Sequence, residues 1–262
     1  MTYTIRPAAP AAAAFTRRGR PGGASNIHQI QIHATRGPVP MDRQVMATEN
    51  WFSQQPDRGG WGASADFVVG PDERAGGAVV IVAFGDPIRT FGSWSAGYGS
   101  FGATREWGAA EVGFAIEVAQ PPRWDGTKYV GGDSDEPFTP ETVDAVAWLC
   151  IELNKRLVAA GGRPVPATHI DYWDQLRDAP VPRGYLGHVD LANGVKLGKT
   201  DPGQMWNWPA FLSKVEGAGV PKLSPPVSNR KAAMSAWWNG VEPLAQTAEH
   251  DRYEIKIART DA

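Results

Sequence analysis

Apolar and polar positions alternate near the start of the patterned part of the chain. In the run IHQIQIHA, Ile30 and Ile32 alternate with polar residues, which is typical of a β-strand with one buried face. His33 falls on the opposite face, where a functional site could form. Three further runs predict strands, and the first two of them are candidates for a hairpin: ADFVVGPDE, GGAVVIVAFG and AEVGFAIEVAQ.

Helical periodicity is clearest in the run TPETVDAVAWLCIELNKRLVAAGG, where apolar residues recur every three or four positions. Thr139 suits the N-cap and Pro140 the first helical position, while Gly161 and Gly162 end the pattern. Shorter helices are predicted across residues 41–55 and 209–216. Strands mixed with amphipathic helices predict an α/β or α+β layer fold.

Composition divides the 262 residues into three parts. Residues 1–24 are rich in Ala, Pro, Arg and Gly, which predicts an extended or disordered arm. Residues 25–220 carry the predicted strands and helices and form one domain. Residues 221–262 begin with a Pro-rich linker and continue as a C-terminal appendage without a recognisable motif.

The charge balance excludes some partners. With 26 basic and 28 acidic residues, the chain gives no electrostatic reason to expect nucleic-acid binding.

No apolar stretch is long enough to insert across a membrane. The N-terminal run PAAPAAAAF precedes its basic residues, unlike a signal peptide, so we expect synthesis in the cytoplasm. The single cysteine, Cys150, is expected to be buried in a helix, which excludes an intrachain disulfide and a cysteine-rich zinc site.

Three residues suggest metal chemistry. His33, His188 and Asp201 offer two imidazoles and a carboxylate, the ligand set of a catalytic zinc site with one open position. They fall at a strand end and in loop-like segments, where ligands held by a rigid scaffold tend to lie. Lys199 places a positive charge two residues from Asp201. The chain has no HExxH motif, so spacing alone leaves ordinary structural histidines as the alternative.

Several motifs follow one another in an order seen in a known family. They are IHATRG, ENWFSQQP with SADFVVGPD, FGSWSAGYG, VGFAIEVAQ, and GHVDLANGVKLGKTDPGQMWNW. In this order they resemble the zinc-dependent N-acetylmuramoyl-L-alanine amidases of the type 2 class, which are similar to the peptidoglycan recognition proteins. The resemblance covers roughly residues 26–215, and the last motif is the most specific.

The resemblance implies a fold, a cofactor and roles for five residues. It implies a central mixed β-sheet flanked by helices, with Zn²⁺ held by His33, His188 and Asp201. It also implies that Glu117 and Lys199 are the catalytic residues and that a groove accepts peptidoglycan, its glycan strand and stem peptide. The alternative for Glu117 is a carboxylate paired with an arginine, and for Lys199 a solvated loop lysine.

The sequence also departs from the family pattern. Ala65 stands where some relatives have a tyrosine, which leaves Glu117 as the evident proton carrier. Asp66 and Ser95 replace histidines of two other motifs. Asp190 is either an orienting residue for a ligand or a plain surface aspartate. Four tryptophans are candidate walls of the groove, although several of the chain's tryptophans must be core: Trp51, Trp94, Trp206 and Trp208.

The function expected from this resemblance is hydrolysis of the amide between N-acetylmuramic acid and L-alanine. One alternative is a non-catalytic peptidoglycan-binding module, and another is a virion-associated or envelope component that recognises the wall. An enzyme made without a signal peptide suits a phage endolysin that reaches the wall after release. It also suits a bacterial enzyme that recycles wall fragments.

Overall fold

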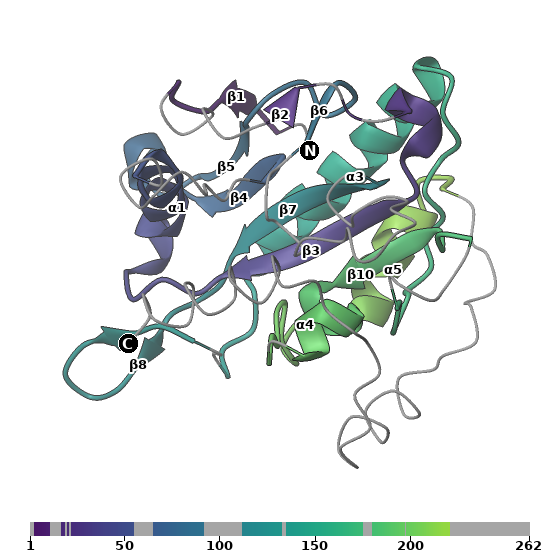
Figure 1. Cartoon of the computed structure of the whole chain (residues 1–262). Helices are drawn as coiled ribbons and strands as arrows, with labels where there is room; N and C mark the ends of the chain where they lie inside the picture. The colour runs from purple at the N-terminus through teal and green to yellow at the C-terminus, as the bar shows by residue number, and fades with distance from the viewer. Residues whose placement is uncertain are drawn as a thin grey trace, which may run out of the picture.

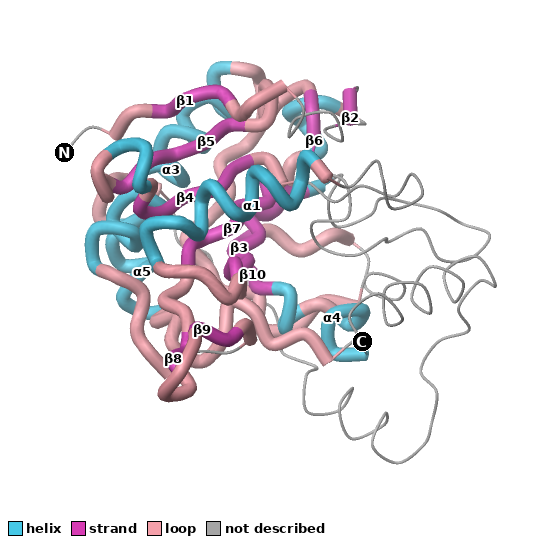
Figure 2. Tube along the Cα trace, turned by 90° about the vertical axis from the view of Figure 1, so that its left-hand side faces the viewer, coloured by secondary structure: helices cyan, strands magenta, loops and turns pink. Residues whose placement is uncertain are grey.

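A mixed six-stranded β-sheet forms the centre of the molecule (Figure 1). The computed structural model describes residues 3–10, 17–18, 20, 22–54, 65–91, 112–132, 135–174, 180–196 and 198–220. The strands of the sheet, in spatial order, are β1 (Ile5–Pro7), β5 (Val79–Ala83), β4 (Phe67–Pro71), β7 (Gly113–Ala119), β3 (Gln29–Thr35) and β10 (Gly184–Gly187). Figure 2 shows them one below another in that order.

Strand direction makes this sheet mixed, as predicted. β4 and β5 pair antiparallel as the expected hairpin, whereas all other neighbours in the sheet are parallel. Two small ladders lie outside it. They are β2 (Arg17–Arg18) with β6 (Thr90–Phe91), and β8 (Arg123–Trp124) with β9 (Tyr129–Val130).

The predicted helices are confirmed near their expected positions. They are α1 (Gln44–Ser53), α3 (Pro140–Ala159) and α5 (Trp208–Glu216), with a shorter α4 at Ala192–Lys196. The Thr139 hydroxyl caps α3 by accepting from the Thr142 amide at 3.3 Å. Short 3-10 helices lie at Gly23–Asn26, Met41–Arg43, Glu73–Ala75 and His188–Asp190. In the described part of the chain, no helix is both long and apolar enough to cross a membrane.

Helices cover both faces of the sheet. The isoleucines of β3 belong to the larger core, to which α3 and α5 contribute their apolar sides. The opposite face meets α1 through Val45 and Phe52, which join a separate cluster with Val68 and Val82. Successive residues along a strand therefore point toward opposite helix layers. Cys150 is buried in the larger core, as expected.

The prediction of a single buried face for β3 is wrong. All seven residues of this strand are buried because it lies between β7 and β10 and both faces of the sheet are covered. Its polar residues therefore need partners inside the protein. Gln31 donates from its side-chain amide to the Gln29 side-chain oxygen at 3.4 Å, and His33 turns toward Asp201.

Part of the predicted N-terminal arm belongs to the sheet. β1 pairs with β5, and Arg6 bonds to Glu49 at 2.6 Å and to Asp72 at 3.0 Å. Arg20 is buried and donates to the Gly113 carbonyl at 2.8 Å. These residues form an edge strand and an anchored segment of the domain, not a tail outside it. The predicted appendage at 221–262 lies outside the described residues.

Candidate metal centre

Strand register brings the first three site residues to one edge of the sheet. His33 of β3 lies directly opposite Glu117 of the parallel strand β7, so both side chains emerge on the same face. On the other side of β3, Gly187 of β10 lies opposite Ile32. His188, the next residue, therefore comes beside His33 as β10 ends.

Asp201 reaches the same edge because two glycines allow a close approach of the backbone. A side chain at Gly187 would collide with Pro202 and lie 2.9 Å from the Asp201 carbonyl. A side chain at Gly194 would collide with the His188 backbone. The Val189 amide donates to the Asp201 carbonyl at 3.1 Å. The loop that carries Asp201 is thus packed directly against the turn that carries His188.

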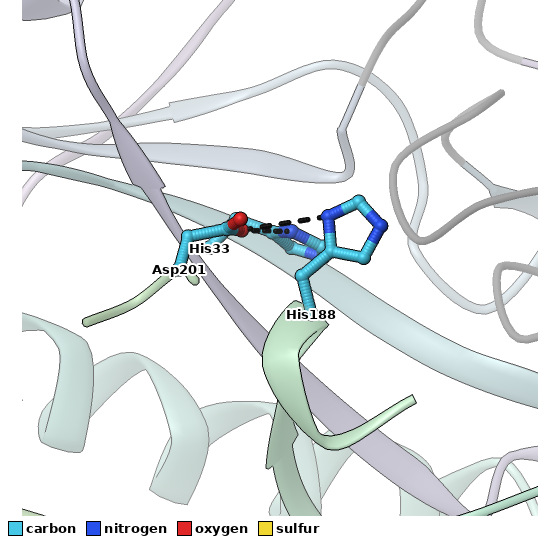
Figure 3. A group of neighbouring side chains, drawn as sticks. All are labelled: His33, His188 and Asp201. Atoms are coloured by element: carbon cyan, nitrogen blue, oxygen red, sulfur yellow. Dashed lines mark hydrogen bonds and ion pairs between the residues drawn. The ribbon is translucent and has the colours of Figure 1, made fainter. Parts of the chain in front are cut away.

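The three candidate ligands point toward one another (Figure 3). Asp201 Oδ2 lies 3.0 Å from His33 Nδ1 and 3.6 Å from His188 Nδ1. One ligand atom from each residue falls within 4.8 Å of the others, and all three side chains are buried. Within the described part of the chain, this is the one group of His, Cys, Asp or Glu residues that could hold a metal ion.

The electrostatics of Asp201 suit a metal ligand. Burial alone would raise its pKa, but the charge of His188 and hydrogen bonds with both imidazoles hold the pKa well below its usual range. The carboxylate is therefore ionised at neutral pH. The Nε2 atoms of both imidazoles are buried without a hydrogen-bond partner, although buried polar atoms are ordinarily paired. Two nitrogens and one carboxylate oxygen in this compact arrangement fit Zn²⁺.

Glu117 lies half-buried beside this group. Burial raises its pKa to about 6, the charge of His33 opposes that rise, and Asp201 adds to it. Glu117 makes no salt bridge or hydrogen bond with the described residues, so the arginine-paired alternative is not what the structure shows. Such a carboxyl group can change its protonation near neutral pH.

Lys199 is exposed and lies close enough for its charge to favour the ionised form of Glu117. Its backbone amide donates to the Gly194 carbonyl at 2.8 Å, which fixes the loop just before Asp201. The structure therefore brings together all five residues expected from the sequence: His33, Glu117, His188, Lys199 and Asp201.

Comparison with known proteins gives similar structures at low sequence identity. No family model matches this sequence, and no curated protein matches it significantly. The chain is similar to AmpDh3 from Pseudomonas aeruginosa in complex with anhydromuramic pentapeptide, at 17% identity over 87% of this chain and 72% of that one, with a TM-score of 0.45.

Two other solved structures are similar at comparable levels. A selenomethionine derivative of AmpD shows 16% identity over 81% of this chain and 94% of that one, with a TM-score of 0.44. The N-acetylmuramyl-L-alanine amidase AmiD from E. coli was solved in complex with its anhydro-N-acetylmuramic acid peptide substrate. It shows 18% sequence identity over 76% of this chain and 61% of that one, with a TM-score of 0.39. All three TM-scores lie below 0.5.

Arg36 is a neighbour of the site that the sequence did not single out. It follows β3 by one residue, and its Nη1 atom donates to the Thr200 hydroxyl at 2.5 Å, next to Asp201. Its charge also favours the ionised form of Glu117. The signal in the sequence was an arginine three residues after a candidate ligand, in IHATRG.

Asp190 is buried, so the alternative of a plain surface aspartate is wrong. Its Oδ2 atom accepts from the Gly187 amide at 2.8 Å and lies 3.0 Å from His169 Nε2. The His169 ring stacks on Trp208 with centroids 4.2 Å apart. Asp190 thus holds the turn around His188 through the backbone, which supports the orienting alternative.

The other singled-out residues lie outside the metal centre or outside the described chain. Trp206 is core, packed on Phe138 and Phe211, and Trp51 is exposed on α1. Asp66 is buried, pairs with Arg20 at 3.3 Å and accepts from the Ala115 amide at 2.8 Å, so its role is structural. Trp94 and Ser95 fall outside the described residues.

Proposed function

We propose that this chain is a zinc-dependent hydrolase that cleaves the amide between N-acetylmuramic acid and L-alanine in peptidoglycan. The observation that carries the proposal is the buried donor set of His33, His188 and Asp201 beside Glu117, a carboxyl group with a raised pKa. The order of the sequence motifs supports the choice of substrate. The phage lysis setting stays a prediction.

The chain's own residues supply the proton transfers. When bound, Zn²⁺ polarises the scissile carbonyl and makes water a stronger acid. Glu117, as the carboxylate, accepts a proton from the attacking water while the new C–O bond forms. It then returns this proton to the leaving nitrogen as the C–N bond breaks. A group with a pKa of about 6 can serve as base and then as acid near neutral pH.

Charge placement assists the same reaction. The carbonyl oxygen gains negative charge as water adds, and in this proposal the Lys199 ammonium stabilises that charge. Asp201 remains ionised, because both imidazoles stabilise its carboxylate, and so stays available as a ligand. Asp190 and the loop glycines keep His188 and Asp201 at their mutual distance.

The test is digestion of purified peptidoglycan by the full chain. We expect release of stem peptides with a free L-alanine amine, loss of this activity with a chelator, and recovery when zinc is restored. Glu117→Gln and Lys199→Ala should each bind zinc normally and lose activity. If both variants bind zinc and keep wild-type rates, the assigned roles are wrong.

A non-catalytic binding module is the alternative that the same experiment decides. Such a protein would sediment with peptidoglycan, release no peptide and be indifferent to Glu117→Gln. The complete donor set favours catalysis, as does a Glu117 without an ion pair among the residues that the structure describes, because neither is required for binding alone.

A further inference from the structure

Two exposed aromatic side chains lie together on the hairpin formed by β8 and β9, which projects from the domain (Figure 1). Trp124 and Tyr129 are direct cross-strand partners, with ring centroids 4.9 Å apart and planes at 67°. Trp124 is 55% exposed and Tyr129 is 38% exposed. Large apolar surface that stays in water at one place is a common sign of a binding site.

Hairpin stability alone does not account for this exposure. A cross-strand aromatic pair does help to hold two short strands together. However, the turn is already closed by Asp125, whose Oδ1 atom accepts from the amides of Thr127 and Lys128, each at 2.9 Å. The rings could close the same ladder while packed on the domain. Instead they line an open cavity of about 640 Å³ with Pro38, Lys128, Val130 and Gly131.

The hairpin that lines this cavity contacts the loop that follows β3, and that loop contacts the loop that carries Asp201. A side chain at Gly131 would come within 2.7 Å of the Arg36 carbonyl, and the Gly132 amide donates to that carbonyl at 3.4 Å. On its other side, Arg36 bonds to Thr200, the residue before Asp201. The hairpin and the ligand loop are therefore linked through one residue, Arg36.

We propose that the hairpin cavity is a saccharide subsite for the glycan strand of peptidoglycan. The inference rests on the proposed function. Trp124 and Tyr129 would stack on the C–H faces of a pyranose ring, and Lys128 would bond to its hydroxyl or acetamido oxygen. The sugar held there is a different unit from the muramyl residue whose amide is cleaved.

The chemistry of the lining favours a neutral sugar over a stem peptide. Among its six residues, Lys128 is the one charged side chain, and two others present aromatic faces. A stem peptide carries several carboxylates, which are recognised by arginine forks or groups of backbone amides. Aromatic faces, by contrast, match the apolar faces of an uncharged pyranose ring.

The direct test is binding of peptide-free glycan strands to the full chain. These strands lack the scissile amide, so binding is measured without hydrolysis. Trp124→Ala should raise the Kd about tenfold, or about 1.4 kcal/mol in binding free energy, because it removes one of the two stacking faces. Trp124→Phe should restore most of the affinity, which separates loss of stacking from loss of the hairpin. Val158→Ala, an exposed apolar position on α3, is the matched control and should leave the Kd within twofold.

The outcomes separate this subsite from the proposed function. If Trp124→Ala weakens glycan binding while the wild type cleaves nothing, the subsite stands and the hydrolase proposal falls. If the wild type cleaves peptidoglycan and Trp124→Ala binds glycan strands normally, the subsite is overturned. It is also overturned if Trp124→Ala weakens binding of a free stem peptide and not of the glycan. If the hairpin binds the glycan strand, Trp124→Ala slows digestion of polymeric peptidoglycan. The same variant should cleave a single-sugar muramyl peptide at a rate within twofold of the wild type.

Discussion

Two groups of acidic side chains in this domain differ in how their charge is balanced. At the β1 edge, buried Glu49 and Asp72 pair with Arg6 and Arg74. At the carboxyl edge of β3 and β7, Glu117 has no such partner among the described residues. Burial would raise the pKa of all three, but hydrogen bonds from the arginines lower it for the first two. Paired acids hold the fold together, whereas the unpaired acid is suited to proton transfer.

The sharpest way to break this comparison is to neutralise Glu117. Glu117→Gln should lower the rate of peptide release by about 100-fold or more, the range found for loss of a general acid–base group. Because Glu117 makes no ion pair with any residue in the described part of the chain, the melting temperature should change little. Rates on purified peptidoglycan and thermal unfolding of the same samples check both halves. A strongly destabilised variant would show that Glu117 is structural after all.

Substitution of Asp190 tests whether its hydrogen bonds hold the turn that carries the ligand His188. Asp190→Ala removes the acceptor for the Gly187 amide and the partner of His169, so the His188 turn should loosen. We expect the Kd for zinc to rise about 10- to 100-fold, as is common for groups that hold metal ligands in place. Asp190→Asn keeps one oxygen acceptor and should recover part of the affinity. Competition with a chromophoric chelator measures both, and zinc binding unchanged in Asp190→Ala would contradict the role.

Acid should separate the two groups without any mutation. Glu117 must be ionised to accept a proton, so activity should fall as the pH drops through its folded pKa of about 6, by up to tenfold at pH 5. A bound cation favours the carboxylate, which places this limb at or below pH 6. Glu49 and Asp72 have lowered pKa values in the folded protein, so their ionised forms stabilise the fold at any pH above their ordinary pKa values of 4.5 and 3.8. That stability is lost only below those values.

At pH 5 the protein should therefore still be folded, but its rate of peptide release should be low. Circular dichroism and rate measurements across pH 4–8 check this separation. Coincident loss of structure and activity above pH 5 would show that acid acts on the fold and not on Glu117.

The smallest expected effect is at the paired acids. Glu49→Gln weakens the hydrogen bonds with Arg6 and Arg74, which are partly exposed and so screened by water. We expect a loss of about 1–2 kcal/mol in the free energy of unfolding, measured with denaturant. The catalytic rate at 25 °C should stay within twofold, because this cluster lies at the β1 edge. An activity loss comparable to that of Glu117→Gln would erase the distinction between the two groups.

Local sequence was sufficient for the three longer helices, for strands β3, β4, β5 and β7, and for the candidate ligands. Thr139, Pro140 and the recurring apolar residues specify α3, because capping and helical spacing are properties of neighbouring residues. The hairpin of β4 and β5 follows in the same way from two adjacent β-branched runs. The residue types and the motifs indicate His33, His188 and Asp201 as a donor set.

Tertiary structure alone decided what these residues face. His33 and Asp201 are 168 residues apart, and they meet because the register of β3 with β10 and the close packing at Gly187 bring their loops together. Alternation in β3 could not show that its polar face is covered, since burial depends on elements distant in sequence. The same holds for buried Asp190 and for the raised pKa of Glu117. The burial of Asp190 and the raised pKa of Glu117 depend on residues that are distant in sequence, whereas helix caps and strand alternation depend on residues close together in the sequence.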